Sequence, residues 1–106
     1  TLYQHTRSFI LSHHNPYYYQ GTCASGIGSP HTPKNYIWHI ALSMQGLTGT
    51  KEEAKKMINL ILETSNNEGL CHEGFNKDEP SEYTRSWFAW ANSLFAELVY
   101  QTYFVK

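Results

Sequence analysis

The sequence lacks the usual marks of a disulfide-stabilised or membrane-spanning protein. Its two cysteines, Cys23 and Cys71, lie far apart and fit neither a Cys-x-x-Cys redox pair nor a four-ligand zinc site, so we expect two unpaired thiols. The longest apolar runs, such as residues 60–62, are far shorter than the roughly 20 residues that a membrane helix needs. We therefore expect no membrane partner.

Charge of either sign is also scarce. Charged side chains make up 16% of the 106 residues, and eight basic against nine acidic residues leave a formal net charge of −1. Binding to nucleic acid depends on a concentration of positive charge, so nucleic acid is not an expected partner. No charged segment followed by an apolar run stands at the start of the given sequence, and its first residue is Thr1 rather than Met, so we expect a piece of a longer protein.

Apolar side chains, by contrast, make up 41% of the sequence, which is enough to form a core and excludes intrinsic disorder. Residues 50–65 predict an amphipathic helix. Thr50 and Glu53 have the spacing of a capping box at its start. The apolar residues that recur at helical spacing are Ala54, Met57, Ile58, Ile61 and Leu62.

Two further segments, 36–47 and 86–103, are apolar on nearly all sides and predict helices that are buried all around. A short helix over residues 1–11 is expected to pack through Leu2, Phe9 and Ile10. So short a chain cannot surround two buried helices by itself. We therefore expect an all-α toroid of inner and outer helices, completed by the remainder of the same domain.

Two long loops, residues 15–34 and 66–84, are rich in turn-forming and aromatic residues, and loops of such length are usually functional. His31 and Thr32 stand between two prolines, which suits them to fixed hydrogen bonds with a polar ligand. A rigid turn leading into the next helix explains the same residues. The nearby Gly-Ile-Gly is not a dinucleotide-binding loop, because no third glycine opens a helix there.

The second loop places His72 beside Glu73. Metal binding is not expected, because neighbouring residues on a loop point apart. A carboxylate among aromatic rings is partly desolvated and suited to activate water as a general base, although an ordinary surface glutamate has the same pattern. Arg85 could hold a sugar hydroxyl or pair with Glu82, and Trp87 could stack on a sugar or fill the core.

Five strings of the sequence together resemble glycoside hydrolase family 125, whose members are exo-acting α-1,6-mannosidases. The strings are NPYYY at 15–19, GIGSPHTP at 26–33, MQGLT at 44–48, HEGF at 72–75 and TRSWFAWANSLF at 84–95. The resemblance covers essentially the whole chain and implies that residues 1–106 are the C-terminal portion of a catalytic domain. It also implies an all-α (α/α)6 barrel with alternating inner and outer helices and long functional loops.

The activity that the resemblance implies is metal-independent and inverting, without a cofactor, on the terminal mannose of oligosaccharides such as N-glycans. Glu73 takes the role of general base by resemblance, and the family's general acid is an upstream aspartate with no counterpart here. Asp78, the single aspartate of the chain, is interpreted as part of a solvated turn. The expected substrate-binding residues are His31, Thr32, His72, Arg85 and Trp87.

The chain departs from the common family pattern at three positions: His39 and Ser86 stand where proline is commoner, and Gly74 where serine is. A different function class fits the same residues, namely a non-catalytic helical module for carbohydrate binding or protein interaction, which needs the aromatic rings but no pair of carboxyls.

In the enzyme interpretation, the two long loops precede parallel helices. We therefore expect Glu73 at the same end of the helices as His31 and Thr32.

Overall fold

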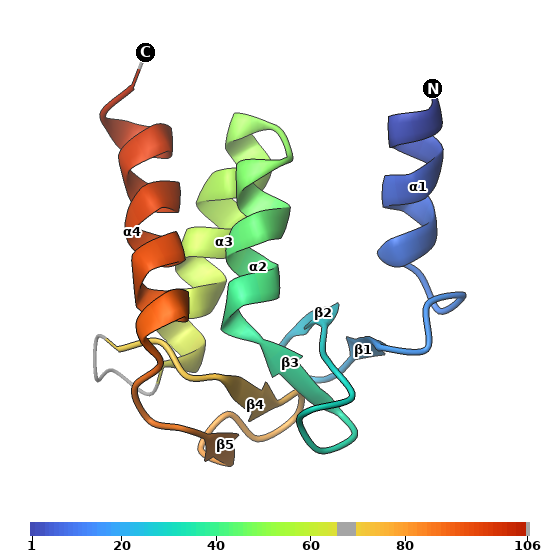
Figure 1. Cartoon of the computed structure of the whole chain (residues 1–106), viewed down its shortest axis with the longest axis vertical. Coiled ribbons are helices and arrows are strands. Elements are labelled where there is room, and N and C mark those ends of the chain that lie inside the picture. Colours follow the sequence, from blue (N-terminus) through green and yellow to red (C-terminus); the bar gives the residue numbers. More distant parts are fainter. Residues whose placement is uncertain (66–69, 106) are drawn as a thin grey trace.

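A computed structural model describes residues 1–65 and 70–105, which form four helices and five short strands (Figure 1). The helices are α1 (Leu2–Ile10), α2 (His39–Leu47), α3 (Lys51–Thr64) and α4 (Ala89–Tyr103). The strands are β1 (Tyr18–Gln20), β2 (Ser25–Ile27), β3 (Tyr36–Trp38), β4 (Gly74–Asn76) and β5 (Tyr83–Thr84).

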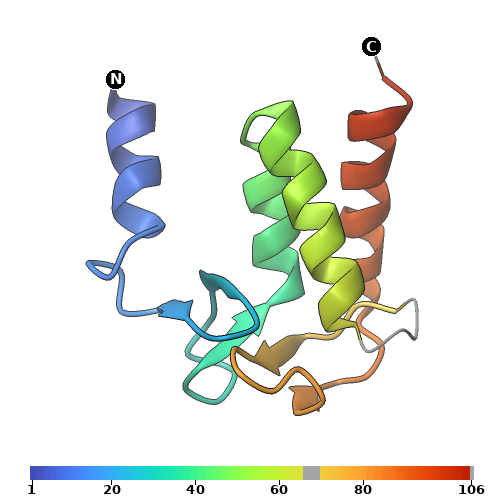
Figure 2. The same cartoon turned by 180° about the vertical axis from the view of Figure 1, so that it is seen from behind.

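Helices α2, α3 and α4 pack together, and the strands lie at one end of them (Figures 1 and 2). Helices α2 and α4 both rise away from the strands, whereas α3 returns toward them. Helix α1 stands to one side, next to β1. The strands therefore gather the loop residues that precede α2 and α4 at a single end of the molecule.

The predicted helix 50–65 is confirmed as α3. The Thr50 hydroxyl accepts a hydrogen bond from the Glu53 backbone N–H at 3.2 Å, which satisfies one of the free donors at the helix start. The buried stripe contains the predicted Ala54, Met57, Ile58 and Ile61, whereas Leu62 lies at its edge and is exposed. Periodicity therefore identified both this helix and its packed face.

The other two long helices are shorter than predicted. Helix α2 begins at His39 rather than at residue 36, because the aromatic and β-branched residues 36–38 form β3. Helix α4 begins at Ala89 rather than at residue 86. Neither helix has a side-chain N-cap: Trp38 and Phe88 precede them with extended backbone.

The expectation of an all-α fold is wrong, because the described chain contains two small antiparallel sheets. Strands β1 and β2 form a hairpin, and β3, β4 and β5 form a three-stranded sheet in which Phe75 faces Ile37 on one side and Tyr83 on the other. These strands satisfy the backbone hydrogen bonds of loops that lie against the helices. Each is two or three residues long, too short for the alternation that reveals a strand in a sequence.

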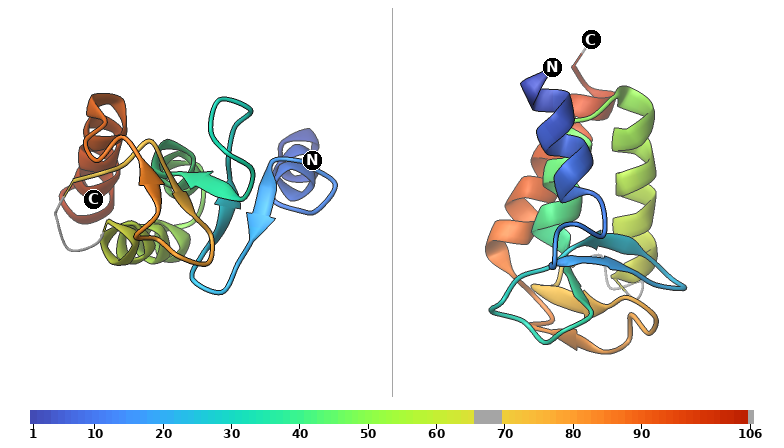
Figure 3. Two further views of the ribbon diagram at one scale, coloured as in Figure 1. Left: turned by 90° about the horizontal axis from the view of Figure 1, so that it is seen from below. Right: turned by 90° about the vertical axis from the view of Figure 1, so that its right-hand side faces the viewer.

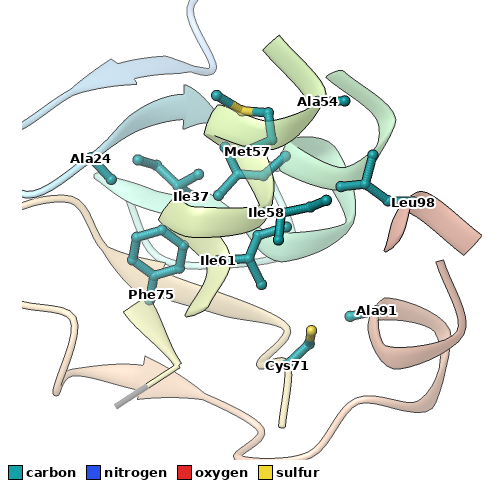
Figure 4. Close-up of a cluster of buried hydrophobic side chains, with 11 residues drawn as sticks. Ala24, Ile37, Ala54, Met57, Ile58, Ile61, Cys71, Phe75, Ala91 and Leu98 are labelled. Atoms are coloured by element: carbon teal, nitrogen blue, oxygen red, sulfur yellow. The ribbon is translucent and has the colours of Figure 1, made fainter. Parts of the chain in front are cut away.

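The core lies between the helices and the three-stranded sheet (Figure 4). Its largest fully buried apolar side chains are Ile37, Leu42, Ile61, Phe75 and Leu98. The prediction of unpaired thiols is confirmed: Cys23 is exposed, and Cys71 is buried beside the core, where desolvation raises the pKa of its thiol to about 11. None of the helices in the described ranges has the length and apolarity required to cross a membrane.

Helix α1 forms as predicted, but its predicted packing is wrong. Leu2 is 83% exposed, and Phe9 and Ile10 are also exposed. Helix α4 is likewise not buried all around: Trp90, Tyr100 and Tyr103 are exposed along it. Within the described residues, the two helices thus present apolar side chains that no other part of the chain covers.

Candidate active site

The segment around Glu73 is held beside β3 and next to the first long loop. Trp38 pairs with Gly74 across the sheet, and a Cβ atom added to Gly74 would lie 3.3 Å from Cγ2 of Thr32. This confirms that Glu73 lies at the same end of the helices as Thr32 and its neighbour His31. Figure 3 shows the segments that precede α2 and α4 together at that end. The predicted loop also includes residues 66–69, which lie outside the described residues.

An open cleft of about 630 Å³ lies at this end, against the start of α4. It is lined by Glu73, Arg85, Trp87, Phe88, Ala89 and Trp90. The Glu73 side chain is 17% exposed, whereas Trp87 and Trp90 are 58% and 74% exposed. The cleft therefore combines one largely buried carboxylate with accessible aromatic rings and one cation.

Arg85 is held beside Glu73 by an unusual backbone conformation. Its φ of 50° lies in the left-handed region, which residues other than glycine rarely adopt. The guanidinium lies over the Phe88 ring, 5.6 Å from its centroid, and Nε lies 3.7 Å from Oε1 of Glu73. Backbone strain of this kind persists where the surrounding structure imposes it, and it is common at functional sites.

Glu73 itself is anchored through its backbone and its neighbour. Its N–H donates to the Thr84 carbonyl at 3.1 Å, in register with the pairing of β4 and β5. His72 is fully buried; its ring stacks on Tyr83 with centroids 3.9 Å apart, and its Nδ1–H donates to the Ser86 carbonyl at 3.0 Å. His72 therefore supports the walls of the cleft and does not line it.

The first long loop is also outside the cleft lining. Thr32 is buried, and its hydroxyl donates to the Ser29 carbonyl at 3.2 Å. His31 is exposed, and its backbone N–H donates to the Ser29 hydroxyl at 3.1 Å. Of the six predicted site residues, the structure thus brings Glu73, Arg85 and Trp87 together in the cleft.

Sequence reasoning missed several residues that build the site. Phe88 and Trp90 line the cleft, Phe88 directly before α4 and Trp90 in its first turn. Asn92 accepts a hydrogen bond from the Cys71 N–H at 3.1 Å and donates to the Phe88 carbonyl at 2.9 Å. A lone asparagine in an apolar run was the available signal for this link between α4 and the segment before Glu73.

Asp78, interpreted from sequence as part of a solvated turn, is exposed and lies outside the cleft lining. Lys77 donates to it at 2.8 Å and the Thr22 N–H at 2.7 Å, and these two hydrogen bonds lower the pKa of its carboxyl. A proton donor needs the opposite shift. The described ranges also contain no group of three or more His, Cys, Asp and Glu side chains arranged to hold a metal ion.

Comparison with known proteins relates the whole arrangement to one family. The profile of the metal-independent α-mannosidases (GH125) matches residues 1–100. The chain is 40% identical over 100 residues to the meiotically up-regulated gene 157 protein of Schizosaccharomyces pombe, covering 92% of this chain and 20% of that protein.

A solved structure is similar over nearly the same range. It is that of a metal-independent α-mannosidase of Streptococcus pneumoniae in a non-productive complex with α-1,6-mannobiose, 50% identical with a TM-score of 0.92. The match covers 94% of this chain and 24% of that one. The chain therefore spans about a fifth to a quarter of the length of these relatives.

Proposed function

Because the chain belongs to glycoside hydrolase family 125, the metal-independent α-mannosidases, we propose that it supplies part of the active site of an exo-acting α-1,6-mannosidase. The observation that carries this proposal is the cleft in which the largely buried Glu73 carboxylate lies beside Arg85 and exposed tryptophans. The proposed substrate is the terminal mannose of oligosaccharides such as N-glycans. The α-1,6-mannobiose bound to the S. pneumoniae relative supports that choice.

Glu73 is the proposed general base of an inverting hydrolysis. Its carboxylate takes a proton from a water molecule while the water oxygen forms a bond to the anomeric carbon. The glycosidic bond on the opposite face breaks, and its oxygen leaves after receiving a proton from a general acid. A carboxylate with little exposure at the edge of an open cleft suits this role, because it meets water only on the substrate side.

The remaining cleft residues are proposed to bind the sugar. Trp87 and Trp90 present flat apolar surfaces on which the apolar face of a sugar ring can stack. Arg85 carries several N–H donors for sugar hydroxyl oxygens. We propose that His31 contacts more distant parts of the substrate, whereas the buried Thr32 and His72 hold the loops that shape the site.

The general acid is proposed to come from the remainder of the same domain. An inverting pair of carboxyls is separated by roughly 6.5–9.5 Å. Glu73 is the only carboxylate among the described residues that line the cleft, and the exposed Asp78 has a lowered pKa. The remainder of the domain is also the proposed cover for the exposed apolar side chains of α1 and α4.

Substitution of Glu73 by glutamine in the full-length enzyme tests the proposal. The amide is nearly isosteric but cannot accept the proton of water, so we expect kcat on α-1,6-mannobiose to fall by about 10²- to 10⁴-fold with little change in mannobiose binding. The anomeric form of the released mannose, followed by proton NMR in the active enzyme, tests inversion. Glu79→Gln, an exposed change outside the cleft, is the matched control. Undiminished turnover by Glu73→Gln contradicts the proposal.

A further inference from the structure

Two histidines from distant parts of the chain lie together under the active-site end of the molecule. His39 is the first residue of α2, and His72 precedes Glu73. Both are fully buried, and their ring centroids lie 5.4 Å apart. The Phe75 ring packs against His39 at 4.8 Å, so the pair is enclosed by the core on that side.

The hydrogen bonds of His39 define its protonation state. Its Nδ1 accepts from the His72 backbone N–H at 2.8 Å, so this nitrogen carries no proton. Its Nε2 then carries the proton and donates to the Thr64 hydroxyl at 2.9 Å, and that hydroxyl donates to the Leu60 carbonyl at 2.8 Å. A protonated ring would place a second N–H against that of His72. Desolvation agrees with this assignment, because it lowers the pKa of His39 to about 3.

The polypeptide at Glu73 is consequently held from both sides. On one side, the His72 N–H is bound to Nδ1 of His39, whose position is set by the start of α2. On the other side, the Glu73 N–H is bound to the Thr84 carbonyl of β5. The His72 ring extends the same network to Ser86, which lies between Arg85 and Trp87 of the cleft.

We propose that neutral His39 is a positioning residue for Glu73, acting through its acceptor bond to the backbone N–H of His72. The inference rests on the proposed role of Glu73 as general base. Replacing Nδ1 by an apolar group would remove the acceptor to which the buried His72 N–H donates. The peptide would then shift to find one and move the adjacent carboxylate, and a displacement of about 1 Å in a reacting group costs up to about 10²-fold in rate.

Two conservative variants of the full-length enzyme separate the two bonds of His39. His39→Asn keeps an acceptor near the position of Nδ1, whereas His39→Gln keeps a donor near the position of Nε2. We expect kcat on α-1,6-mannobiose within about 3-fold of wild type for His39→Asn and about 10- to 100-fold lower for His39→Gln, with KM changed little in both. Hydrogen exchange of the His72 amide is expected to accelerate at least about 10-fold in His39→Gln alone.

Thr64→Val is the matched control, because it removes the partner of Nε2 and leaves the bond to His72 in place. We expect it to lower the melting temperature while kcat stays within about 3-fold of wild type. If the rates of all three variants fall in proportion to their melting temperatures, or if His39→Gln leaves exchange at His72 unchanged, the inference is overturned.

Glu73→Gln, assayed in parallel, distinguishes the two levels of the proposal. If the Glu73→Gln enzyme is active, the proposed role of Glu73 as general base is contradicted, and the proposed role of His39 is contradicted with it. If the Glu73→Gln enzyme is inactive but the His39→Gln enzyme is fully active, only the inference about His39 is contradicted.

Discussion

Glu73 and Arg85 share one wall of the cleft, with Nε of Arg85 3.7 Å from Oε1 of Glu73, although their exposures differ strongly at 17% and 65%. The glutamate is fixed by the sheet, and the arginine projects from a strained backbone into the open part of the cleft. The proposed general base is thus the less exposed of the two groups, and the cation proposed to contact the substrate is the more exposed.

Arg85→Ala is therefore expected to weaken substrate binding more than catalysis. Loss of the guanidinium removes the donors proposed for sugar hydroxyls, so we expect KM for α-1,6-mannobiose to rise about 10-fold with a smaller change in kcat. Steady-state kinetics of the full-length enzyme measure both. Lys55→Ala, which removes an exposed cation from α3, is the control. A loss confined to kcat would show that Arg85 serves the reaction step instead.

Removal of either exposed tryptophan tests the stacking role. Trp87→Ala and Trp90→Ala each remove an aromatic face from the cleft, and we expect each to reduce mannobiose affinity by about 5- to 10-fold. Tyr100→Ala, an exposed ring elsewhere on α4, serves as the control and should bind normally. Titration calorimetry in the Glu73→Gln background measures the affinity without turnover. Unchanged affinity in both tryptophan variants would exclude stacking at this cleft.

Gly74→Ser is expected to stabilise the protein. Gly74 has no left-handed backbone requirement, and a Cβ atom there would lie 3.5 Å from both Trp38 Cδ1 and Thr84 Oγ1. Within residues 1–65 and 70–105, Trp38 Nε1 and Thr84 Oγ1 are buried without a hydrogen-bond partner, and a serine hydroxyl can bond one of them. Lower entropy of the unfolded chain and one new hydrogen bond together suggest about 1 kcal/mol.

Thermal unfolding of the wild type and Gly74→Ser measures this gain. The matched comparison is Gly28→Ser, where the added Cβ would lie 2.1 Å from the Tyr36 carbonyl oxygen. That variant is expected to be clearly destabilised. A melting temperature for Gly74→Ser below that of the wild type would show that Thr32, 3.3 Å from the new Cβ, cannot move aside.

The buried His39 predicts a dependence of stability on pH. Burial lowers its pKa from 6.5 to about 3, so between these values the unfolded chain binds a proton that the folded chain does not. The contribution of His39 to the free energy of unfolding is therefore complete above pH 6.5. Below pH 6.5 the free energy of unfolding falls by about 1.4 kcal/mol per pH unit for this one group.

Urea unfolding at pH 6.5, 5.5 and 4.5 compares the wild type with His39→Asn. We expect the free energy of unfolding to depend less steeply on pH in the variant, by the amount that corresponds to about one bound proton, because asparagine does not titrate. Parallel slopes for the two proteins would show that His39 is protonated in the folded state.

The elements that sequence reasoning located are those whose determinants are local. Thr50 and the apolar stripe that follows it define α3 within a single segment. The pattern predicts a helix over residues 36–38 because their strand partners, residues 74–76, lie far along the chain, and pairing across that distance leaves no trace in a three-residue segment.

The residues of the candidate site can likewise be divided into those that the local sequence predicts and those that depend on distant contacts. Glu73, Arg85 and Trp87 stand in recognisable strings, and the structure brings them together. The bond between His39 and the His72 backbone joins residues 33 positions apart, and a backbone donor has no side-chain signature. The left-handed conformation of Arg85 was equally hidden, since arginine has no preference for it.

The attachment of helix α1 has a consequence for handling the protein. The helix buries none of its residues and is joined to the other helices through Arg7 and Tyr3. Arg7 pairs with Glu53 and donates to the Thr48 hydroxyl at 3.1 Å, and the Tyr3 hydroxyl donates to the Thr48 carbonyl. Such polar contacts weaken as dissolved ions screen them, whereas the apolar contacts between α2, α3 and α4 do not. In a preparation of residues 1–106 alone, high ionic strength should therefore release α1 first, and a protease added then should cut between residues 11 and 17 while the three packed helices stay intact.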